Sequence, residues 1–475
     1  MLLRQLFDFP DQLLFGKCLH RFVFYKIRIL VLISLLRICE NKNYPQHFSF
    51  LSQFGDIGTK TTTLPKTAAF APPSGLRRFL RALGPGLIIA ALVFGPGSLT
   101  VASKLGAGFG YALLWVVPAA IVFMIAFTLM AGKIGLATDQ TLMQLIREKY
   151  GPWPARLIGV GVFLITAAFQ AGNSVGVGIA FGALFDTPPT AWIVLFTAMG
   201  AALLFFRSFY TVLEKIMIAL VGLMLVAFFS TLIASRPDLG ELLRGFAPVL
   251  PAGSELLALA LAASSFSIVG AFYQAYLVLA KGLGSGDFLS SRSEAITGIL
   301  LLGLITLTVM GSAAAVLHPK GLSIQSAGDM AKVLEPLLGP ATTTLFMLGL
   351  FGASFSSLVG NATIGGSTAA KPLAGGNRLQ AIPVRLTIVG VMAVGAAVAV
   401  TFSALPLELI VFAQGVTIFV APLIGLALLA LANDRSLLKE RTNNLLMNVT
   451  GGIGLLLLLG LAISYAIQIY AKFAG

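Results

Sequence analysis

The stretch LVFGPGSLTVASKLG (92–106) holds residues whose types and spacing suit ion binding. Gly95, Pro96 and Gly97 interrupt a hydrophobic run long enough to cross a bilayer, and Ser98 follows them. Such a break frees backbone N–H and C=O groups, which lipid cannot satisfy but a bound ion can. The stretch therefore predicts an ion-binding site in the middle of a membrane helix.

A second polar interruption occurs in ASSFSIVGAFYQAYLVLAKG (263–282). Gly270 lies there in a polar run that comprises Ser264, Ser265, Ser267, Tyr273 and Gln274. Interruptions at corresponding positions of two halves, here the first and sixth spans, are typical of inverted-repeat transporters with a site at the midplane. The alternative is a pair of packing kinks without a ligand.

The charge around the first break favours an anion. The break contains no carboxylate, and a half-helix that starts near Gly97 points its positive end at the gap. Lys104, about two turns further along, adds positive potential to an outer vestibule unless it snorkels to the interface. We expect a small inorganic anion, and bicarbonate is a candidate because it is planar and both donates and accepts hydrogen bonds.

Uptake of an anion against an inside-negative potential needs a driving cation. The segment FGASFSSLVGNATIGGS (351–367) offers uncharged oxygen ligands of the kind that suit Na⁺. The candidate sodium ligands are Ser354, Ser356, Ser357 and Asn361. Small-residue packing between helices is the other interpretation of this segment. Sodium coupling is therefore a hypothesis.

The composition identifies a multi-pass integral membrane protein. Of the 475 residues 57% are hydrophobic and 11% charged, and the mean hydropathy is +0.94, which no soluble globular domain carries. The net charge of +14 comes from basic clusters between apolar runs, which are topology signals, so we expect no nucleic-acid partner. Cys18 and Cys39 lie near the N-terminus and the three histidines lie outside the predicted membrane cores, which excludes a Cys or His metal cage there.

The chain divides into an N-terminal extension and linker (1–83), disordered or peripheral, and an all-α membrane domain (84–475). The predicted spans are 84–106, 110–136, 155–184, 190–208, 211–235, 255–281, 294–318, 340–369, 382–403, 407–432 and 447–471. Basic residues cluster before the first span and after the second, eighth and tenth. This pattern places the N-terminus in the cytoplasm and the C-terminus outside, across the plasma membrane.

The segment GPGLIIAALVFGPGSLTVASKLGAGFGYALLW (84–115) resembles the first span of the NRAMP metal-ion transporters, which carry GPG, DPGN and FGYALLW at the same spacing. The resemblance extends over DQTLMQLIREKYG, LEKIMIALVGLM and LELIVFAQGVTIFVAPLIGLALLALANDRSLL, to about Arg441. It implies a leucine-transporter-type fold with two inverted five-helix repeats (84–235 and 255–432), broken first and sixth helices and an extra helix (447–471). In that fold the first and eighth spans commonly flank a sodium site.

The chain departs from the family at its metal site, which uses the Asp and Asn of DPGN and a Met and a His in span six. Gly95 and Ser98 stand at the first two positions, and span six has neither Met nor His. Gln414 matches the family's glutamine in span ten, and Phe272, Tyr273 and Gln274 align with its Met-Pro-His. The expected substrate-binding residues are Gly95, Pro96, Gly97, Ser98, Gly270, Ala271, Tyr273, Gln274 and Gln414. Without anionic or soft ligands this is a poor Mn²⁺ or Fe²⁺ site.

The family's proton route is altered as well. Its third span carries an acidic pair in a TDLAE pattern, where this chain has FQAGN with Gln170 and Asn173 at the acidic positions. Amides keep the shape of carboxylates but carry no proton at physiological pH. We expect hydrogen bonds between helices at these positions and no proton coupling through them.

Three functions stay open: a transporter of a small anion, a divalent-cation (Mg²⁺ or Mn²⁺) transporter with an atypical site and no proton coupling, and a receptor that kept the fold without transport. The resemblance alone favours the second. No acid–base pair or nucleophile constellation is evident within the spans, so an enzyme is not expected. The predicted partners are the ion and the lipid bilayer, with Na⁺ as the coupling ion and no other cofactor; the sequence leaves the oligomeric state open.

Overall fold

The computed structural model describes residues 94–205, 207–374, 382–402 and 406–474. The N-terminal extension, with Cys18 and Cys39, and the first part of the first predicted span lie outside the described residues. Within those ranges the chain forms helices and no strand. This all-α architecture is the one that satisfies every backbone hydrogen bond within a single lipid-exposed segment.

The principal helices are α3 (Pro96–Phe109), α4 (Val116–Ala137), α6 (Pro152–Phe185), α7 (Pro189–Leu203), α8 (Arg207–Ala234), α10 (Glu255–Phe266), α11 (Ile268–Ala280), α12 (Phe288–Val316), α15 (Thr342–Ala374), α16 (Ile382–Thr401), α17 (Pro406–Ala432) and α19 (Leu445–Ala474). Shorter helices lie between them: α5 (Leu142–Tyr150), α9 (Leu239–Arg244), α13 (Ala327–Ala331), α14 (Glu335–Leu338) and α18 (Arg435–Leu438). The 3-10 turns are η2 (Ser285–Asp287), η3 (His318–Lys320), η4 (Lys332–Leu334), η5 (Gly339–Ala341) and η6 (Lys439–Arg441).

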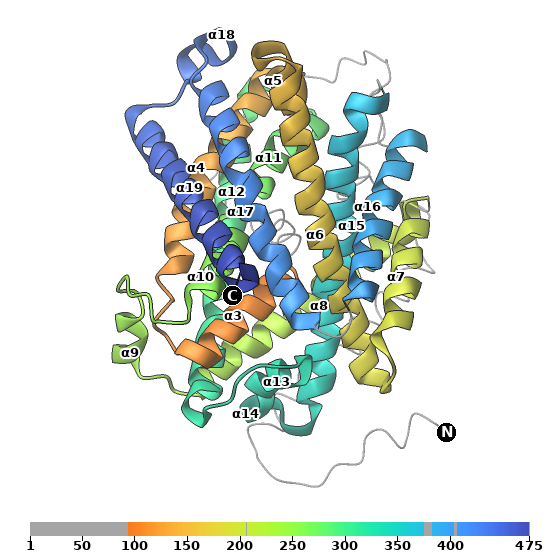
Figure 1. Cartoon of the computed structure of the whole chain (residues 1–475), viewed down its shortest axis with the longest axis vertical. Coiled ribbons are helices and arrows are strands. Elements are labelled where there is room, and N and C mark those ends of the chain that lie inside the picture. Colours follow the sequence, from red (N-terminus) through yellow and green to blue (C-terminus); the bar gives the residue numbers. More distant parts are fainter. Residues whose placement is uncertain (1–93, 206, 375–381, 403–405, 475) are drawn as a thin grey trace, which may run out of the picture.

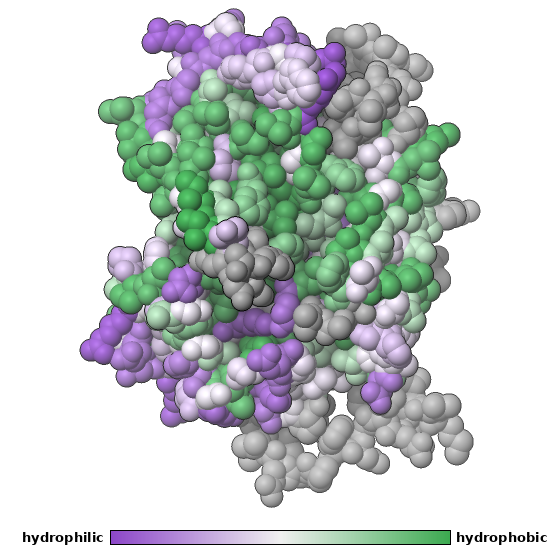
Figure 2. All heavy atoms as spheres, in the orientation of Figure 1, coloured by the Kyte–Doolittle hydropathy of each residue, from purple (hydrophilic) through white to green (hydrophobic). Residues whose placement is uncertain are grey.

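The predicted spans correspond to these helices. Within the described ranges, 8 segments are long and apolar enough to cross a membrane, and α10 with α11 counts as one of them. Two further predicted spans are shorter apolar helices, Pro189–Leu203 and Ala219–Ala234, and the first predicted span is described only from Phe94 onward. Figure 2 shows hydrophobic residues in a broad band between two hydrophilic ends, as expected of a protein that crosses a bilayer.

The helices pack in two groups that α17 joins. One group contains α6, α7, α15 and α16, and the other contains α3, α4, α10, α11 and α12 (Figure 1). Helix α17 contacts α6 in the first group and α3, α4 and α10 in the second, while α8 packs against α15 and α12. Small residues allow these close approaches; a β-carbon on Gly106 of α3 would overlap the Met310 carbonyl oxygen of α12.

Loops predicted to share a side of the membrane lie at the same end of the molecule. Helices α5 and α18 occupy one end, and α9, α13 and α14 occupy the other (Figure 1). Lys149 of α5 forms an ion pair with Asp434, and its Nζ donates to Ser436 Oγ at 2.8 Å. A capping box between Thr141 and Gln144 starts α5.

Candidate functional site

Helix α3 begins at the predicted break, with Pro96 as its first residue. Gly95 precedes it in an extended conformation, with φ −96° and ψ −174°, and has no side chain that could cap the helix. The first-turn donors of Gly97 and Ser98 therefore lack the side-chain acceptor that usually covers a helix start. The first backbone N–H of the helix that donates a hydrogen bond within the chain is that of Leu99, to the Gly95 carbonyl at 3.3 Å.

Side chains from three other helices surround this start. A β-carbon on Gly95 would lie 3.3 Å from Ser357 Oγ of α15 and 3.4 Å from Asn173 Oδ1 of α6. Gln414 of α17 covers Gly97 so closely that a β-carbon there would overlap its Nε2 atom. The structure thus brings together Gly95, Gly97 and Gln414, which were predicted to bind the substrate. Next to them lie Ser357, a predicted sodium ligand, and Asn173, at a former proton-path position.

The amide pair on α6 is held by a directed chain of hydrogen bonds. Gln170 Nε2 donates to the Leu358 carbonyl of α15 at 2.5 Å, and Asn173 Nδ2 donates to Gln170 Oε1 at 3.3 Å. Both side chains are buried. Because the amide nitrogen of Asn173 is used in this chain, its oxygen is the atom that faces Gly95. The expected hydrogen bond between helices is therefore present at Gln170, whereas the bond donated by Asn173 stays within α6.

The predicted sodium ligands on α15 divide into two sets. Ser354, Ser357 and Asn361 follow one another at helical spacing on one face. Ser354 Oγ is fully buried and has no hydrogen-bond partner among the described residues. A β-carbon on Gly176 would overlap it and lie 2.9 Å from Pro96 Cβ. Ser356 lies off this face, and its hydroxyl donates to the Ala353 carbonyl at 3.2 Å. The face with Ser354 and Ser357 is the one that meets the start of α3.

The second break lies at Ser267, whose φ of 38° and ψ of 58° place it in the left-handed region between α10 and α11. Ser267 belongs to the polar run that, together with Gly270, was predicted to interrupt the span, and Gly270 itself lies inside α11. Just before the break, Ser264 Oγ donates to the Leu261 carbonyl at 3.1 Å, and the buried Ser265 Oγ has no partner in the part of the chain that the structure describes. Ser267 is therefore a non-glycine residue in a region that favours glycine, which costs about 1–2 kcal/mol.

The predicted residues on α11 face other neighbours. Gln274 is buried, and its Nε2 donates to Ser291 Oγ of α12 at 3.4 Å. Ala271 is fully buried, and the Tyr273 ring stacks on Tyr276 with 6.1 Å between centroids. Gln274 thus lies against α12 and, at Gly132, against α4.

Lys104 has a partner that the sequence analysis did not identify. Its Nζ lies 3.7 Å from Glu408 Oε1 in the first turn of α17, and the two side chains are 15% and 49% exposed. The predicted positive charge of the vestibule is therefore partly neutralised. A carboxylate at the start of the tenth predicted span was the available signal, but nothing in the sequence paired it with a lysine about 300 residues earlier.

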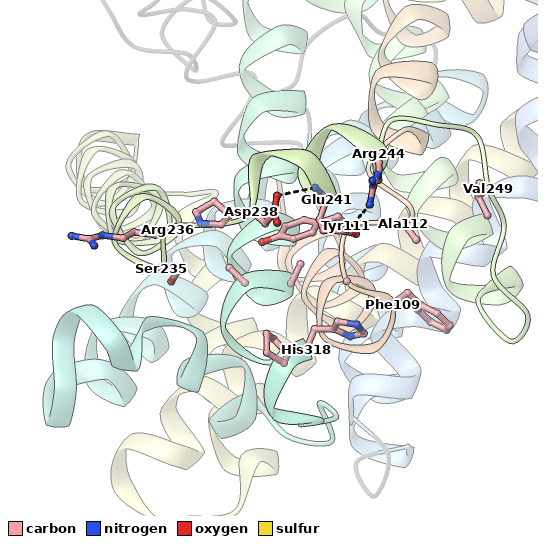
Figure 3. Close-up of a pocket in the computed structure, with 16 residues that line it drawn as sticks. Phe109, Tyr111, Ala112, Ser235, Arg236, Asp238, Glu241, Arg244, Val249 and His318 are labelled. Carbon is pink, nitrogen blue, oxygen red and sulfur yellow. Dashed lines mark hydrogen bonds and ion pairs between the residues drawn. The ribbon is translucent and has the colours of Figure 1, made fainter.

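A pocket of about 550 Å³ lies at the end of the molecule that carries α9 (Figure 3). Its wall includes His318, whose Nδ1 lies 3.0 Å from the Ala107 carbonyl, and an ion pair of 2.6 Å between Arg244 and Glu241. None of the predicted site residues lines it. The described residues also contain no group of three or more His, Cys, Asp or Glu side chains that could hold a metal ion.

These features define a multi-pass helical membrane protein with a leucine-transporter-type fold and a polar, uncharged centre. The chain belongs to the natural resistance-associated macrophage protein-like family, whose model matches residues 86–468. The resemblance seen in the sequence is confirmed.

Known proteins similar to this chain include the divalent metal cation transporter MntH of Deinococcus radiodurans, with 29% identity over 317 residues, covering 60% of this chain and 68% of that protein. The crystal structure of a manganese transporter from Eremococcus coleocola matches with a TM-score of 0.68 and 17% identity, covering 86% of this chain and 90% of that one. MHP1, a nucleobase-cation-symport-1 family transporter, matches with a TM-score of 0.52 and 14% identity, covering 82% and 93%. At these identities the structural matches establish the fold.

Proposed function

We propose that this member of the family is a secondary transporter that moves a small inorganic anion, with bicarbonate as the candidate, in symport with Na⁺. The anion passes the start of α3, where α3, α6, α15 and α17 meet. The family is one of transporters, so an enzyme activity is not part of the proposal.

The observation that carries the proposal is the absence of charge around Gly95 in the described part of the chain. The side-chain atoms nearest to a β-carbon there belong to Ser357 and Asn173, and Gln414 covers Gly97. A divalent metal ion that has lost its water needs anionic or strong ligands in a low-dielectric interior. Hydroxyl and amide groups do not supply them, whereas they do hydrogen-bond an oxyanion.

The two sides of the junction suit ions of opposite charge. On the α17 side, Gln414 Nε2 and the first-turn N–H groups of α3 are donors, which favour an anion. On the side of α6 and α15, Asn173 Oδ1 and the hydroxyls of Ser354 and Ser357 present oxygen atoms, which favour Na⁺. An anion and a cation held side by side would each reduce the cost of bringing the other out of water.

Proton coupling through α6 is not part of this mechanism. The Gln170 and Asn173 amides are committed to the hydrogen bonds with each other and with the Leu358 carbonyl. Neither group exchanges a proton at physiological pH.

The proposal also includes an orientation in the plasma membrane. Basic residues gather at the end that carries α5 and α18, among them Arg147, Lys149, Arg435, Lys439 and Arg441. The positive-inside rule assigns this end to the cytoplasm. The N-terminus then lies inside, and α19 carries the C-terminus outside.

A divalent cation is the second candidate substrate, and the names of the relatives favour it. MntH of Deinococcus radiodurans is described as a divalent metal cation transporter, and the Eremococcus coleocola protein as a manganese transporter. The oxygen atoms of Asn173 and Ser357 suit a cation that keeps most of its water, as Mg²⁺ does.

Ion flux into proteoliposomes tests the proposal. The purified protein is reconstituted with an internal pH reporter and an internal divalent-metal reporter, and Na⁺ is present or replaced by choline. We expect bicarbonate-dependent alkalinisation that requires Na⁺, with no metal signal. Entry of Mn²⁺ or Mg²⁺ without a bicarbonate response would contradict the anion and establish the second candidate. Bicarbonate uptake at the same rate in choline would contradict sodium coupling.

A further inference from the structure

Lys133 and Arg292 form a pair of like charges at the end of the molecule that carries α5 and α18. Lys133 lies one turn before the end of α4, and Arg292 lies in the second turn of α12. The two helices pack against each other, and Arg292 is close enough to repel the charge of Lys133. Two positive charges thus lie together near the membrane surface, and neither belongs to the ion site described above.

No carboxylate among the described residues balances this pair. Lys133 Nζ donates to Met447 Sδ of α19 at 3.1 Å, and a thioether sulfur is a weak acceptor. Arg292 is exposed and forms no ion pair or side-chain hydrogen bond with the residues that the structure describes. Like charges repel each other, so an anion between the two side chains would stabilise both of them.

Two other lysines at the same end have carboxylate partners. Lys281 Nζ lies 2.8 Å from Glu294 Oε2, and Lys149 forms an ion pair with Asp434. Glu294 is only two residues from Arg292, but residues at this spacing do not face each other on a helix. A surplus of basic residues on one side of the membrane therefore does not account for Lys133 and Arg292, which lie close together without a counter-charge.

The pair lies beside an apolar surface that faces lipid. Leu445 and Leu446 directly precede Met447, and they are 80% and 72% exposed. The Arg441 guanidinium stacks over the Phe288 ring at 5.9 Å, and Phe288 lies one turn before Arg292 on α12. A further positive charge thus borders the pair. Positive charge next to exposed leucines matches a molecule with an anionic head and an apolar tail.

We propose that Lys133 and Arg292 bind the phosphate group of an acidic phospholipid in the cytoplasmic leaflet, with the acyl chains against the first turn of α19. A phosphate replaces the repulsion between the two side chains with an attraction to each, and a guanidinium can donate two parallel hydrogen bonds to it. Basic sites between membrane helices on the cytoplasmic side bind anionic lipid head groups in this way. The choice of leaflet rests on the proposed orientation, and the binding does not depend on which ion is transported.

Thermal unfolding in detergent with added phosphatidylglycerol tests the proposal, because a lipid that binds the folded protein raises its melting temperature. In Arg292→Gln the lipid concentration that gives half of the full rise should increase about fivefold, since one basic contact with the anionic head group is lost. Lys133→Gln should behave in the same way. Phosphatidylcholine, which has no net charge, should not raise the melting temperature of the wild type to a comparable extent.

Arg156→Gln is the matched control. It removes one positive charge at the same end of the molecule, where Arg156 lies over the Trp153 ring at 5.5 Å. The half-maximal concentration of phosphatidylglycerol should stay within about twofold of the wild-type value. An equal increase in Arg156→Gln and Arg292→Gln would mean that the lipid responds to the overall charge, and it would overturn the proposed site.

The same variants without added lipid distinguish binding from a structural role. Arg292→Gln removes the repulsion of Lys133, so this variant should melt at the wild-type temperature or above it. An unchanged half-maximal lipid concentration in Arg292→Gln would overturn the proposal. Stabilisation by inorganic phosphate equal to that by phosphatidylglycerol would mean that the pair binds a free anion, and it would overturn the assignment to a lipid.

Discussion

The two helix breaks differ in what makes them. The first is determined by the local sequence, because Gly95 is extended and Pro96 begins a helix. Since Gly95 and Gly97 have no side chains, other helices approach the backbone closely there. The second depends on one serine, Ser267, in the left-handed region. The first break is thus a place where backbone is exposed to neighbouring polar groups, whereas the second is a bend at a single residue. This difference is the reason that we propose binding at the first break.

A charge placed at the first break should have the largest effect. In Gly95→Asp the new carboxylate lies next to Ser357 and Asn173, and its repulsion of an anion should lower bicarbonate uptake about a hundredfold. Mn²⁺ binding, measured by calorimetry on the same protein, should become detectable.

Gly95→Asn is the control for shape, because it adds an uncharged side chain of the same size. It should retain far more uptake than Gly95→Asp. Equal loss in the two variants would mean that steric crowding and not charge is responsible, and full uptake in Gly95→Asp would remove the anion from this break.

Substituting alanine for one glycine at each break tests which break matters more for transport. In Gly97→Ala the new β-carbon overlaps Gln414, so this side chain must leave the start of α3, and uptake should fall about tenfold. In Gly270→Ala the β-carbon meets Ser267 Oγ at 2.9 Å and Met124 Cε at 3.6 Å, both of which can rotate away. Uptake by Gly270→Ala should stay within about twofold of wild type. The reverse ranking would make the second break the more important one.

The sequence was sufficient for the first break and insufficient for the rest of the site, for physical reasons. A Gly-Pro-Gly run limits the backbone locally, and apolar runs of about 20 residues fix the helices that must surround it. The partner of Gln170 is a backbone carbonyl on α15, which has no signature in the sequence. The position of Ser267 and the pairing of Lys104 with Glu408 depend on contacts between distant segments.

Removing the partner of Lys104 should have a smaller effect, because this pair lies outside the first break. In Glu408→Gln the lysine regains its full charge, so anion uptake at low ionic strength should rise about twofold to threefold. The gain should disappear at high salt, where exposed charges are screened. Initial rates at two salt concentrations measure this. A salt-independent decrease would mean that the ion pair holds α3 against α17.

Relief of strain at the second break should change stability more than transport. In Ser267→Gly the left-handed conformation loses its steric cost, so the free energy of unfolding should rise by about 1 kcal/mol. Ser267→Ala keeps the strain and should show no rise. Thermal unfolding of the two variants in detergent provides the comparison. A large loss of uptake in Ser267→Gly would show that the bend itself takes part in binding.

The start of α13 is capped by side chains, unlike the start of α3, and a substitution there should have the smallest effect of those proposed. At α13, Asp329 binds Lys332 at 2.8 Å and accepts from Ser326, and the bond to Lys332 is the main reason that its pKa falls to about 2. A lowered pKa stabilises the fold above the unfolded value of about 4 and loses this effect as the pH falls toward 2. Because the ion pair is partly exposed, with 50% of the Lys332 side chain and 25% of the Asp329 side chain accessible, the gain is under about 1 kcal/mol.

The difference in melting temperature between wild type and Asp329→Asn should therefore be small at pH 7 and vanish between about pH 4 and pH 2. Melting curves across this range measure it. A difference that persists unchanged to pH 2 would mean that the aspartate acts through its shape alone.

The uncharged junction of Gly95, Asn173, Ser357 and Gln414 has an electrical consequence. A membrane potential does about 2.3 kcal/mol of work per elementary charge moved across 100 mV, and it does none on amides and hydroxyls. Rearrangement of these residues therefore carries no gating charge, and any current through the junction is that of the transported ions. One bicarbonate with one Na⁺ would give no current, whereas a second Na⁺ would make each cycle carry one positive charge inward. The steady-state current of reconstituted protein under voltage clamp thus reports the stoichiometry directly.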